Sequence, residues 1–290
     1  MSILEATPPV SSASLPSRNA LTRLLREPSA LVGGFIVITF LVMAALAPLL
    51  APYDPNASDW MAIREAPSWS HPFGTDDLGR DILARVIYGA RASLAAGFIS
   101  VTIAMIIGVP LGLVAGYFGG VTDVVISRCA DALLACPFLV LAIALAAFLG
   151  ASLENAMIAI GVSAMPTFIR LTRGQALSVR AEDYVSAAIS QGVSHPKILA
   201  AYIFPNVVPP LIVQATLTVA IAVLAEASLA FLGLGQAPPA PSWGSMLDAA
   251  RQFLVEAPWM AIWPGLAIVV VVIGFNMLGD ALNDVLNPRT

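Results

Sequence analysis

Long apolar runs separated by short charged stretches dominate the pattern of this chain. A helix that crosses a bilayer needs about 20 consecutive apolar residues. Six runs reach or approach that length, at about 30–51, 93–117, 124–149, 153–172, 208–234 and 258–280. The pattern therefore predicts an all-α integral membrane protein with six transmembrane helices.

The uncharged stretch at 227–247 is not expected to form a seventh span. It contains two glycines and then Pro238, Pro239 and Pro241, and a helix cannot continue through such a segment. We expect the end of the fifth span there, followed by a rigid loop.

Composition supports a membrane environment, and it argues against a nucleic-acid partner, a disulfide and a metal site. Hydrophobic residues make up 58% of the chain and charged residues 11%, against roughly 45–50% and about 25% in soluble domains. A net charge of −4 argues against a nucleic-acid partner, which usually leaves a basic footprint. Cys129 and Cys136 lie in one apolar run, too far apart to form a disulfide. No metal-ligand spacing is present.

The distribution of Arg and Lys predicts the orientation of the chain. With the N-terminus inside, the inner segments hold eight of these residues and the outer segments five, which favours an N-in/C-in topology. Residues 1–28 are polar and rich in Pro and Ser, and predict a flexible cytoplasmic tail. A secretory signal peptide is not expected, because the first apolar run is long enough to span.

The segment 71–94 carries polar residues that membrane insertion alone does not explain. Thr75 or Asp76 could cap a helix, after which Leu78, Ile82 and Val86 share one face. This pattern predicts an interfacial amphipathic helix leading into the second span. It could be a membrane-surface anchor or part of an outer surface that meets a partner. The candidate residues are Asp77, Arg80, Asp81 and Arg85.

Glu226 and Trp243 are the candidate gate residues at the outer side. Glu226 lies about 18 residues into the fifth span, roughly 27 Å along a helix. An ionisable group at that depth suggests a functional role, although it could also extend to the headgroups or bond a neighbouring helix. Trp243 follows the proline-rich loop.

The loop at 173–207 predicts two short helices that form a protruding elbow. Ala187 and Ala188 offer a face that another protein could approach closely. Gly192 can end the first helix in a left-handed conformation. Ser194 can then cap the second helix, with Pro196 in its early turn. An ordinary loop of that length is the alternative.

This loop resembles the coupling loop of binding-protein-dependent ABC importer permeases. That family has a Glu-Ala-Ala triplet, a following Gly and a later Leu-Pro; here Ala187, Ala188, Gly192 and Pro205 match by spacing. Ser186 stands in place of the triplet's Glu. Segments 73–94, 228–235, 243–244 and 279–289 resemble the second permease subunit of dipeptide, oligopeptide and nickel importers.

The resemblance implies a MetI-like type I importer fold in a bacterial inner membrane. It implies three kinds of partner: a homologous permease subunit in a heterodimer, two cytoplasmic ABC ATPases, and an extracytoplasmic solute-binding protein. Short peptides are the expected cargo, with nickel chelates, glutathione and opines as alternatives. The expected contacts with the ATPase come from Glu182, Asp183, Tyr184, Ser186, Ala187, Ala188, Gly192, His195 and Pro205.

The resemblance also implies how the chain is divided into parts, and that ATP is bound by other subunits. The expected parts are the tail at 1–28, the first span with the outer loop and interfacial helix at 29–91, and the permease core at 92–290. The chain has no phosphate-binding G-x-x-x-x-G-K-[ST] motif, so ATP and Mg²⁺ are expected on partner subunits. We expect no cofactor on this chain and no enzymatic activity.

An ion-coupled secondary transporter is the rival from a different class. It would place ionisable groups near the bilayer midplane. Here Arg128, Asp131, Glu226 and Asp280 fall near the ends of spans, and Arg128 and Asp131 are expected to pair with each other. An intramembrane metalloprotease would need a His-Glu-x-x-His motif, which is absent. The importer permease is therefore the favoured interpretation.

Overall fold

The computed structural model describes residues 23–286, and it confirms the all-α prediction. The helices are α2 (Pro28–Ala45), α3 (Ala47–Leu50), α4 (Ile82–Phe118), α5 (Gly120–Leu134), α6 (Phe138–Leu149), α7 (Leu153–Arg180), α8 (Asp183–Ser190), α9 (His195–Ile198), α10 (Phe204–Phe231), α11 (Trp243–Ala250) and α12 (Trp259–Leu286). A π-helical turn at Leu199–Ile203 joins α9 to α10. Most of the predicted tail, residues 1–22, lies outside the described residues, as do residues 287–290.

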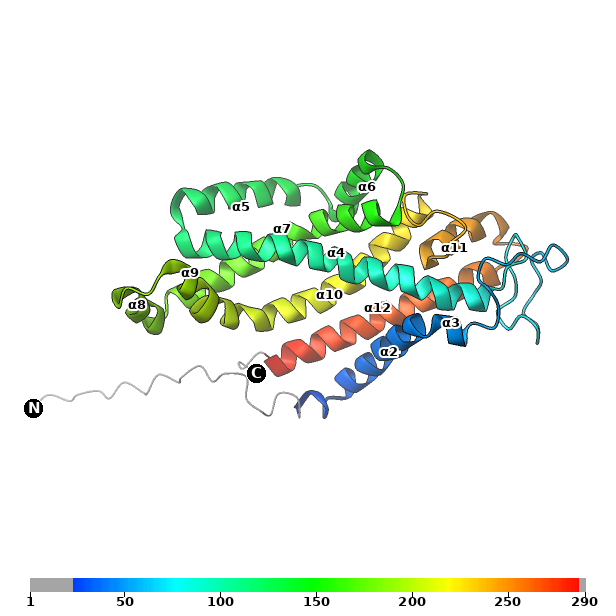
Figure 1. The fold of residues 1–290 in the computed structure, drawn as a ribbon, viewed down its shortest axis with the longest axis horizontal. Helices are drawn as coiled ribbons and strands as arrows, with labels where there is room; N and C mark the ends of the chain where they lie inside the picture. The colour runs from blue at the N-terminus through cyan, green and yellow to red at the C-terminus, as the bar shows by residue number, and fades with distance from the viewer. Residues whose placement is uncertain (1–22, 287–290) are drawn as a thin grey trace, which may run out of the picture.

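The long helices α2, α4, α7, α10 and α12 run side by side and give the bundle two distinct ends (Figure 1). One end carries residues 51–81 and α11, and is called the loop end below. The other carries α8 and α9, together with the start of α2 and the end of α12, and is called the elbow end.

Apolar composition marks four helices as long enough to cross a membrane, and a fifth if α5 and α6 count as one bent span. The predicted third span at 124–149 corresponds to α5 and α6, and it is not one continuous helix. The axes of α5 and α6 differ by 89°, and the break ends at Pro137. Proline has no N–H to bond the preceding turn, and its ring clashes with the carbonyl four residues back, so the helix stops there.

The predicted fourth span coincides with the first part of α7. Ser152 caps this helix by accepting a hydrogen bond from the Asn155 N–H. The helix then continues to Arg180. It is too polar to be counted with the four helices that are long and apolar enough to cross a membrane. The predicted fifth and sixth spans coincide with α10 and α12. As predicted, no helix continues through the proline-rich loop, because α10 ends at Phe231.

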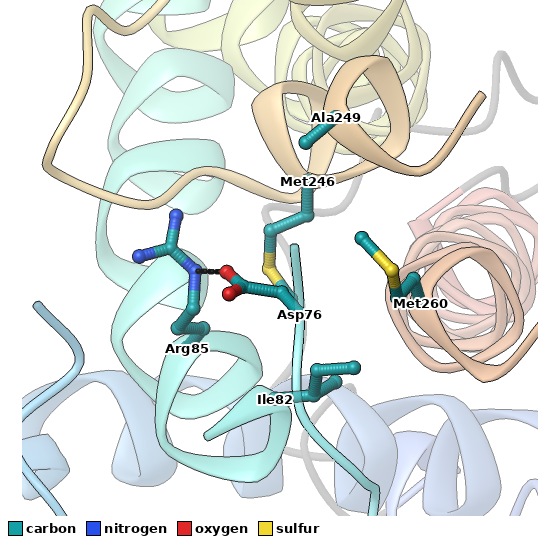
Figure 2. A pocket seen from close by; sticks show the side chains of 6 residues that line it. All are labelled: Asp76, Ile82, Arg85, Met246, Ala249 and Met260. Atoms are coloured by element: carbon teal, nitrogen blue, oxygen red, sulfur yellow. Dashed lines mark ion pairs between the residues drawn. The ribbon is translucent and has the colours of Figure 1, made fainter. Parts of the chain in front are cut away.

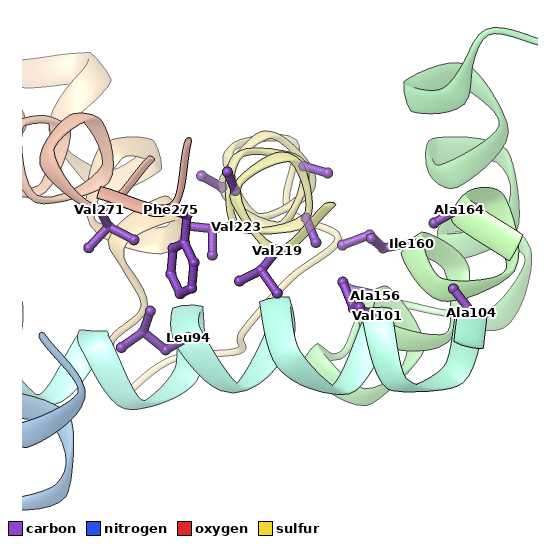
Figure 3. Packing of buried hydrophobic residues seen from close by; sticks show 14 of the residues in the cluster. Leu94, Val101, Ala104, Ala156, Ile160, Ala164, Val219, Val223, Val271 and Phe275 are labelled. Carbon is purple, nitrogen blue, oxygen red and sulfur yellow. The ribbon is translucent and has the colours of Figure 1, made fainter. Parts of the chain in front are cut away.

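The core lies where α4, α7, α10 and α12 meet, and Figure 3 shows its apolar side chains interdigitating. Three glycines of α4 allow its backbone to approach α7 closely. A Cβ built on Gly108 would lie 2.9 Å from the Met165 carbonyl oxygen, and one on Gly112 would lie 2.6 Å from the Thr172 Cβ. Gly116 is equally close to α7. Small residues spaced four apart are a recurrent way to pack membrane helices tightly.

The amphipathic helix predicted within 71–94 is not formed as expected. The structure begins α4 at Ile82, and Asp81 caps it by accepting a 2.7 Å hydrogen bond from the Ala84 N–H. Thr75 and Asp76 are not caps. Gly74 and Gly79 adopt positive φ angles of 78° and 73°, which a helix cannot include. From Ile82 the helix continues without a break into the second span, so the expected boundary at 91/92 falls inside it.

Candidate functional site

Within the loop predicted at 173–207, the two expected short helices, α8 and α9, are joined at a glycine, whereas residues 173–180 belong to α7 and 204–207 to α10. Gly192 has φ = +75°, the left-handed conformation that glycine adopts without steric cost. Ser194 occupies the position before α9, although its side chain makes no capping hydrogen bond, and Pro196 lies in the first turn. The backbone here therefore follows from the residue types.

Most of the predicted coupling residues are exposed on the elbow. These are Glu182, Asp183, Tyr184, Ser186, Ala187, Gly192 and His195, together with Pro205 in the first turn of α10. Ala188 is the exception, because it is only 4% exposed. It lies three residues after the buried Val185, so both face the bundle. Burial and the neighbouring charge of Glu182 raise the pKa of Tyr184.

Tyr117 joins the elbow to the end of α4, and sequence reasoning missed it. Its hydroxyl group is hydrogen-bonded to Nδ1 of His195 at 2.7 Å. The guanidinium of Arg180, the last residue of α7, lies 5.7 Å from the centre of the same ring. A second contact joins Asn206 of α10 to the Tyr184 hydroxyl at 3.2 Å. These contacts link the elbow to α4 and α10, and they link α4 to α7 beside it.

At the loop end, the predicted outer partner surface is instead buried. Arg80 and Asp76 form an ion pair at 2.7 Å, and Asp81 is bonded to His71 at 2.9 Å. Asp76, Arg80, Asp81 and Arg85 are each at most 7% exposed. A buried charge is stable only when it is paired and hydrogen-bonded, and residues 51–81 fold over α4 to provide the partners. Asp77 is half-buried; burial and the charge of Asp76 raise its pKa.

Arg85 connects α4 to two loops. Figure 2 shows its guanidinium directed at the Asp76 carboxylate, 3.4 Å away, beside a small hollow lined by Ile82, Met246, Ala249 and Met260. The same guanidinium donates to the carbonyl oxygens of Pro55 at 2.8 Å and Pro239 at 3.4 Å. Arg85 is therefore a structural connector between α4 and both loops.

Glu226 is fully buried and is hydrogen-bonded to a neighbouring helix. Of the two structural alternatives, extension to the headgroups and bonding to another helix, the structure shows the second. The Oε2 of Glu226 accepts a 3.0 Å hydrogen bond from the Ser93 hydroxyl of α4. The Trp243 N–H donates to the same hydroxyl oxygen at 3.2 Å, and its indole N–H donates to the Val86 carbonyl at 3.0 Å. Glu226 Oε1 has no partner among the described residues. This network holds α4, α10 and α11 together.

Two ion pairs attach α5 to α7. Asp131 is paired with Arg170 at 2.7 Å, so the predicted pairing of Asp131 with Arg128 is wrong. The Arg173 guanidinium donates through Nε to one carboxylate oxygen of Asp123, and through Nη2 to the other at 2.7 Å. Across residues 23–286, no three His, Cys, Asp or Glu side chains gather in a way that could hold a metal ion.

The fold and the site together define a multi-pass helical membrane protein. Buried ion pairs stabilise its loop end, and two short helices project at its elbow end. The chain belongs to the family of binding-protein-dependent transport system inner membrane components, whose model matches residues 108–290. Residues 16–67 match the N-terminal transmembrane domain of oligopeptide transport permease C. The family resemblance predicted from the motifs is therefore confirmed.

Curated relatives match along nearly the whole chain. The dipeptide transport system permease DppC of Alkalihalophilus pseudofirmus is 46% identical, over 96% of this chain and 91% of the relative. The glutathione transport system permease GsiD of Pectobacterium atrosepticum is 42% identical, over 96% and 93%. The probable D,D-dipeptide permease DdpC of Escherichia coli is 43% identical, over 91% and 88%.

A solved structure supports the predicted fold class. A chain of the inward-facing MetNI methionine ABC transporter aligns with a TM-score of 0.58 and 21% identity, covering 70% of this chain and 97% of that one. Because it belongs to this family, the chain is a multi-pass inner-membrane subunit of an ABC importer. It is a transport component rather than an enzyme. It works with ATPase and substrate-binding partners.

Proposed function

We propose that this chain forms half of the translocation path of an importer for short peptides. The observation that carries the proposal is its similarity, over nearly its full length, to permeases whose names specify dipeptides. Glutathione, named for a further relative, is itself a small peptide. Nickel chelates and opines remain the alternative cargoes within the same architecture.

The second half of the path comes from a homologous permease subunit, so the membrane part is a heterodimer. The elbow end faces the cytoplasm and the loop end faces the solute-binding protein. The excess of Arg and Lys in the N-terminal and elbow segments supports this N-in/C-in orientation. So does the position of the start of α2 and the end of α12 at the same end as α8 and α9 (Figure 1).

The elbow receives the closing movement of a cytoplasmic ATPase. Its outward side is formed by exposed residues, among them Glu182, Asp183, Tyr184 and Ala187. Glu182 and Asp183 provide the negative charge one turn before Ser186, the position where the family has glutamate. ATP-driven closure then favours one arrangement of the long helices over another. The core at 92–290 carries this coupling loop at 173–207.

Uptake of a labelled dipeptide by a deletion strain tests the cargo. Loss of uptake, and its return when the gene is supplied on a plasmid, is the expected result. Parallel assays with glutathione and a nickel chelate identify the alternative cargoes. Unchanged dipeptide uptake would refute the proposal. Uptake that stops with a protonophore but survives ATP depletion would instead favour an ion-coupled transporter.

A further inference from the structure

The elbow-end half of α7 has an exposed polar face, on which Arg170 makes the only contact described above, its ion pair with Asp131. Thr167, Arg170, Gly174 and Ser178 are all exposed, and their spacing of three or four residues places them along one side of the helix. These four residues are called the polar strip below. The apolar Leu177 borders it. Other sides of this part of α7 contact α4 and α5.

At the level of the polar strip, the neighbouring helix α4 exposes apolar side chains. Gly108 and Gly112 of α4 meet the α7 backbone at Met165 and Ile169, so Arg170 is level with this part of α4. There α4 exposes Ile106, Ile107 and Leu111, by 67%, 40% and 37%. Exposed isoleucine and leucine on a membrane helix face hydrocarbon or a neighbouring transmembrane helix, and both lie within the membrane. Arg170 therefore lies at hydrocarbon depth.

The charges at this depth are accessible from outside the chain. Arg170 and Asp131 form an ion pair at 2.7 Å, yet their side chains remain 59% and 44% exposed. Charged side chains within membrane spans face a bundle interior or a water-filled cavity, because contact with lipid is costly. Because the pair is exposed on this chain, lipid would be an unfavourable environment for it.

We propose that the polar strip and Asp131 line a water-filled path, and that this path carries the solute. The cargo part of this inference rests on the proposed function, whereas the presence of water does not. The pair offers one carboxylate and one guanidinium side by side. A short peptide carries the complementary ammonium and carboxylate groups at its two ends. The strip therefore suits a zwitterionic solute without attracting either sign of charge in excess.

Thiol accessibility tests the inference in the assembled complex. In a Cys129→Ser, Cys136→Ser background, Thr167→Cys places a thiol at an exposed position of the strip. Ile107→Cys is the matched control, because it lies at the same level on the exposed apolar side of α4. The complete transporter in lipid nanodiscs is exposed on both sides to a membrane-impermeant methanethiosulfonate. The thiolate is the reactive species, so water access governs the rate.

The expected result is modification of Thr167→Cys roughly tenfold or more faster than that of Ile107→Cys, because a thiol in an apolar environment does not ionise. In proteoliposomes, the modified Thr167→Cys complex should lose most of its uptake of labelled dipeptide, while treated Ile107→Cys retains it. Similar rates at the two positions, or full uptake after modification at position 167, would overturn the inference. If the untreated complex takes up no dipeptide, the proposed cargo fails, and the modification rates still test for a water-filled path.

Discussion

The two ends of the bundle hold their polar residues in opposite ways. At the loop end, Asp76, Arg80 and Arg85 are buried and bonded to one another. At the elbow end, acidic residues lie exposed, and the tip is joined to α4 by the hydrogen bond between Tyr117 and His195. Buried charge pairs are costly to separate, whereas a segment with few buried contacts moves at little cost. Disrupting the loop end is therefore expected to cost more free energy than moving the elbow.

One helix connects these two regions. The 37 residues of α4 correspond to a length of about 55 Å at 1.5 Å per residue. Asp81 caps its first turn at the loop end, and Tyr117 lies in its last turn at the elbow end. A displacement of the elbow therefore has a continuous, closely packed element through which to reach the opposite end.

The largest effect is expected from breaking the buried charges of the loop end. Asp76→Ala leaves Arg80 and Arg85 buried without their main partner, which should cost about 3–5 kcal/mol of stability. Thermal unfolding of the purified complex should show a clear fall in Tm. Asp248→Ala is the matched control, because its pair with Arg251 is exposed and should contribute only about 0–1 kcal/mol. Equal shifts for the two variants would contradict a loop end held by buried charges.

A smaller effect is expected midway along α4. Gly112→Ala would place a Cβ 2.7 Å from the Ile169 carbonyl oxygen, forcing α4 and α7 apart at a cost of about 1–3 kcal/mol. Gly34→Ala in α2 meets no atom within 4 Å and should be neutral or slightly stabilising. The same unfolding measurement distinguishes them. A neutral Gly112→Ala variant would show that the close packing of α4 on α7 is not required.

A substitution in the elbow should reduce transport more than it reduces the stability of the protein. Gly192→Ala forces a side chain into a left-handed conformation at a cost of roughly 1–2 kcal/mol, which should tilt α8 and reduce both ATPase association and dipeptide uptake. Gly120→Ala introduces the same strain at φ = +55°, outside the elbow. Co-purification of the ATPase and uptake assays should separate the two variants. A normal complex with Gly192→Ala would remove the elbow from the coupling mechanism.

The smallest effect is expected from Tyr117→Phe, which removes one hydrogen bond to His195 worth about 0.5–1.5 kcal/mol. The expected result is less peptide transported per ATP hydrolysed, with Tm nearly unchanged. Tyr88→Phe on the same helix is the control, since the Tyr88 hydroxyl bonds no residue within 23–286. An unchanged transport-to-hydrolysis ratio would mean that elbow movement reaches α4 by other contacts.

Local pattern in the sequence determined much of this protein. The apolar runs located the long helices, and the prolines after Phe231 excluded a seventh span. Gly192 and Pro196 predicted the elbow, because a positive φ and a helix start depend on residue type within a few positions. The spacing of Ala187, Gly192 and Pro205 identified the family. Each of these features is set by neighbours along the chain.

Tertiary structure alone decided which polar groups meet. Asp131 pairs with Arg170 of α7 rather than with Arg128 on its own helix, and Glu226 is bonded to Ser93, 133 residues away. Arg85, predicted at an outer surface, is buried because residues 51–81 fold over it. Such partners are chosen by how helices pack and which charges then lose contact with water. Those energies depend on neighbours in space, and a linear pattern of residues does not contain them.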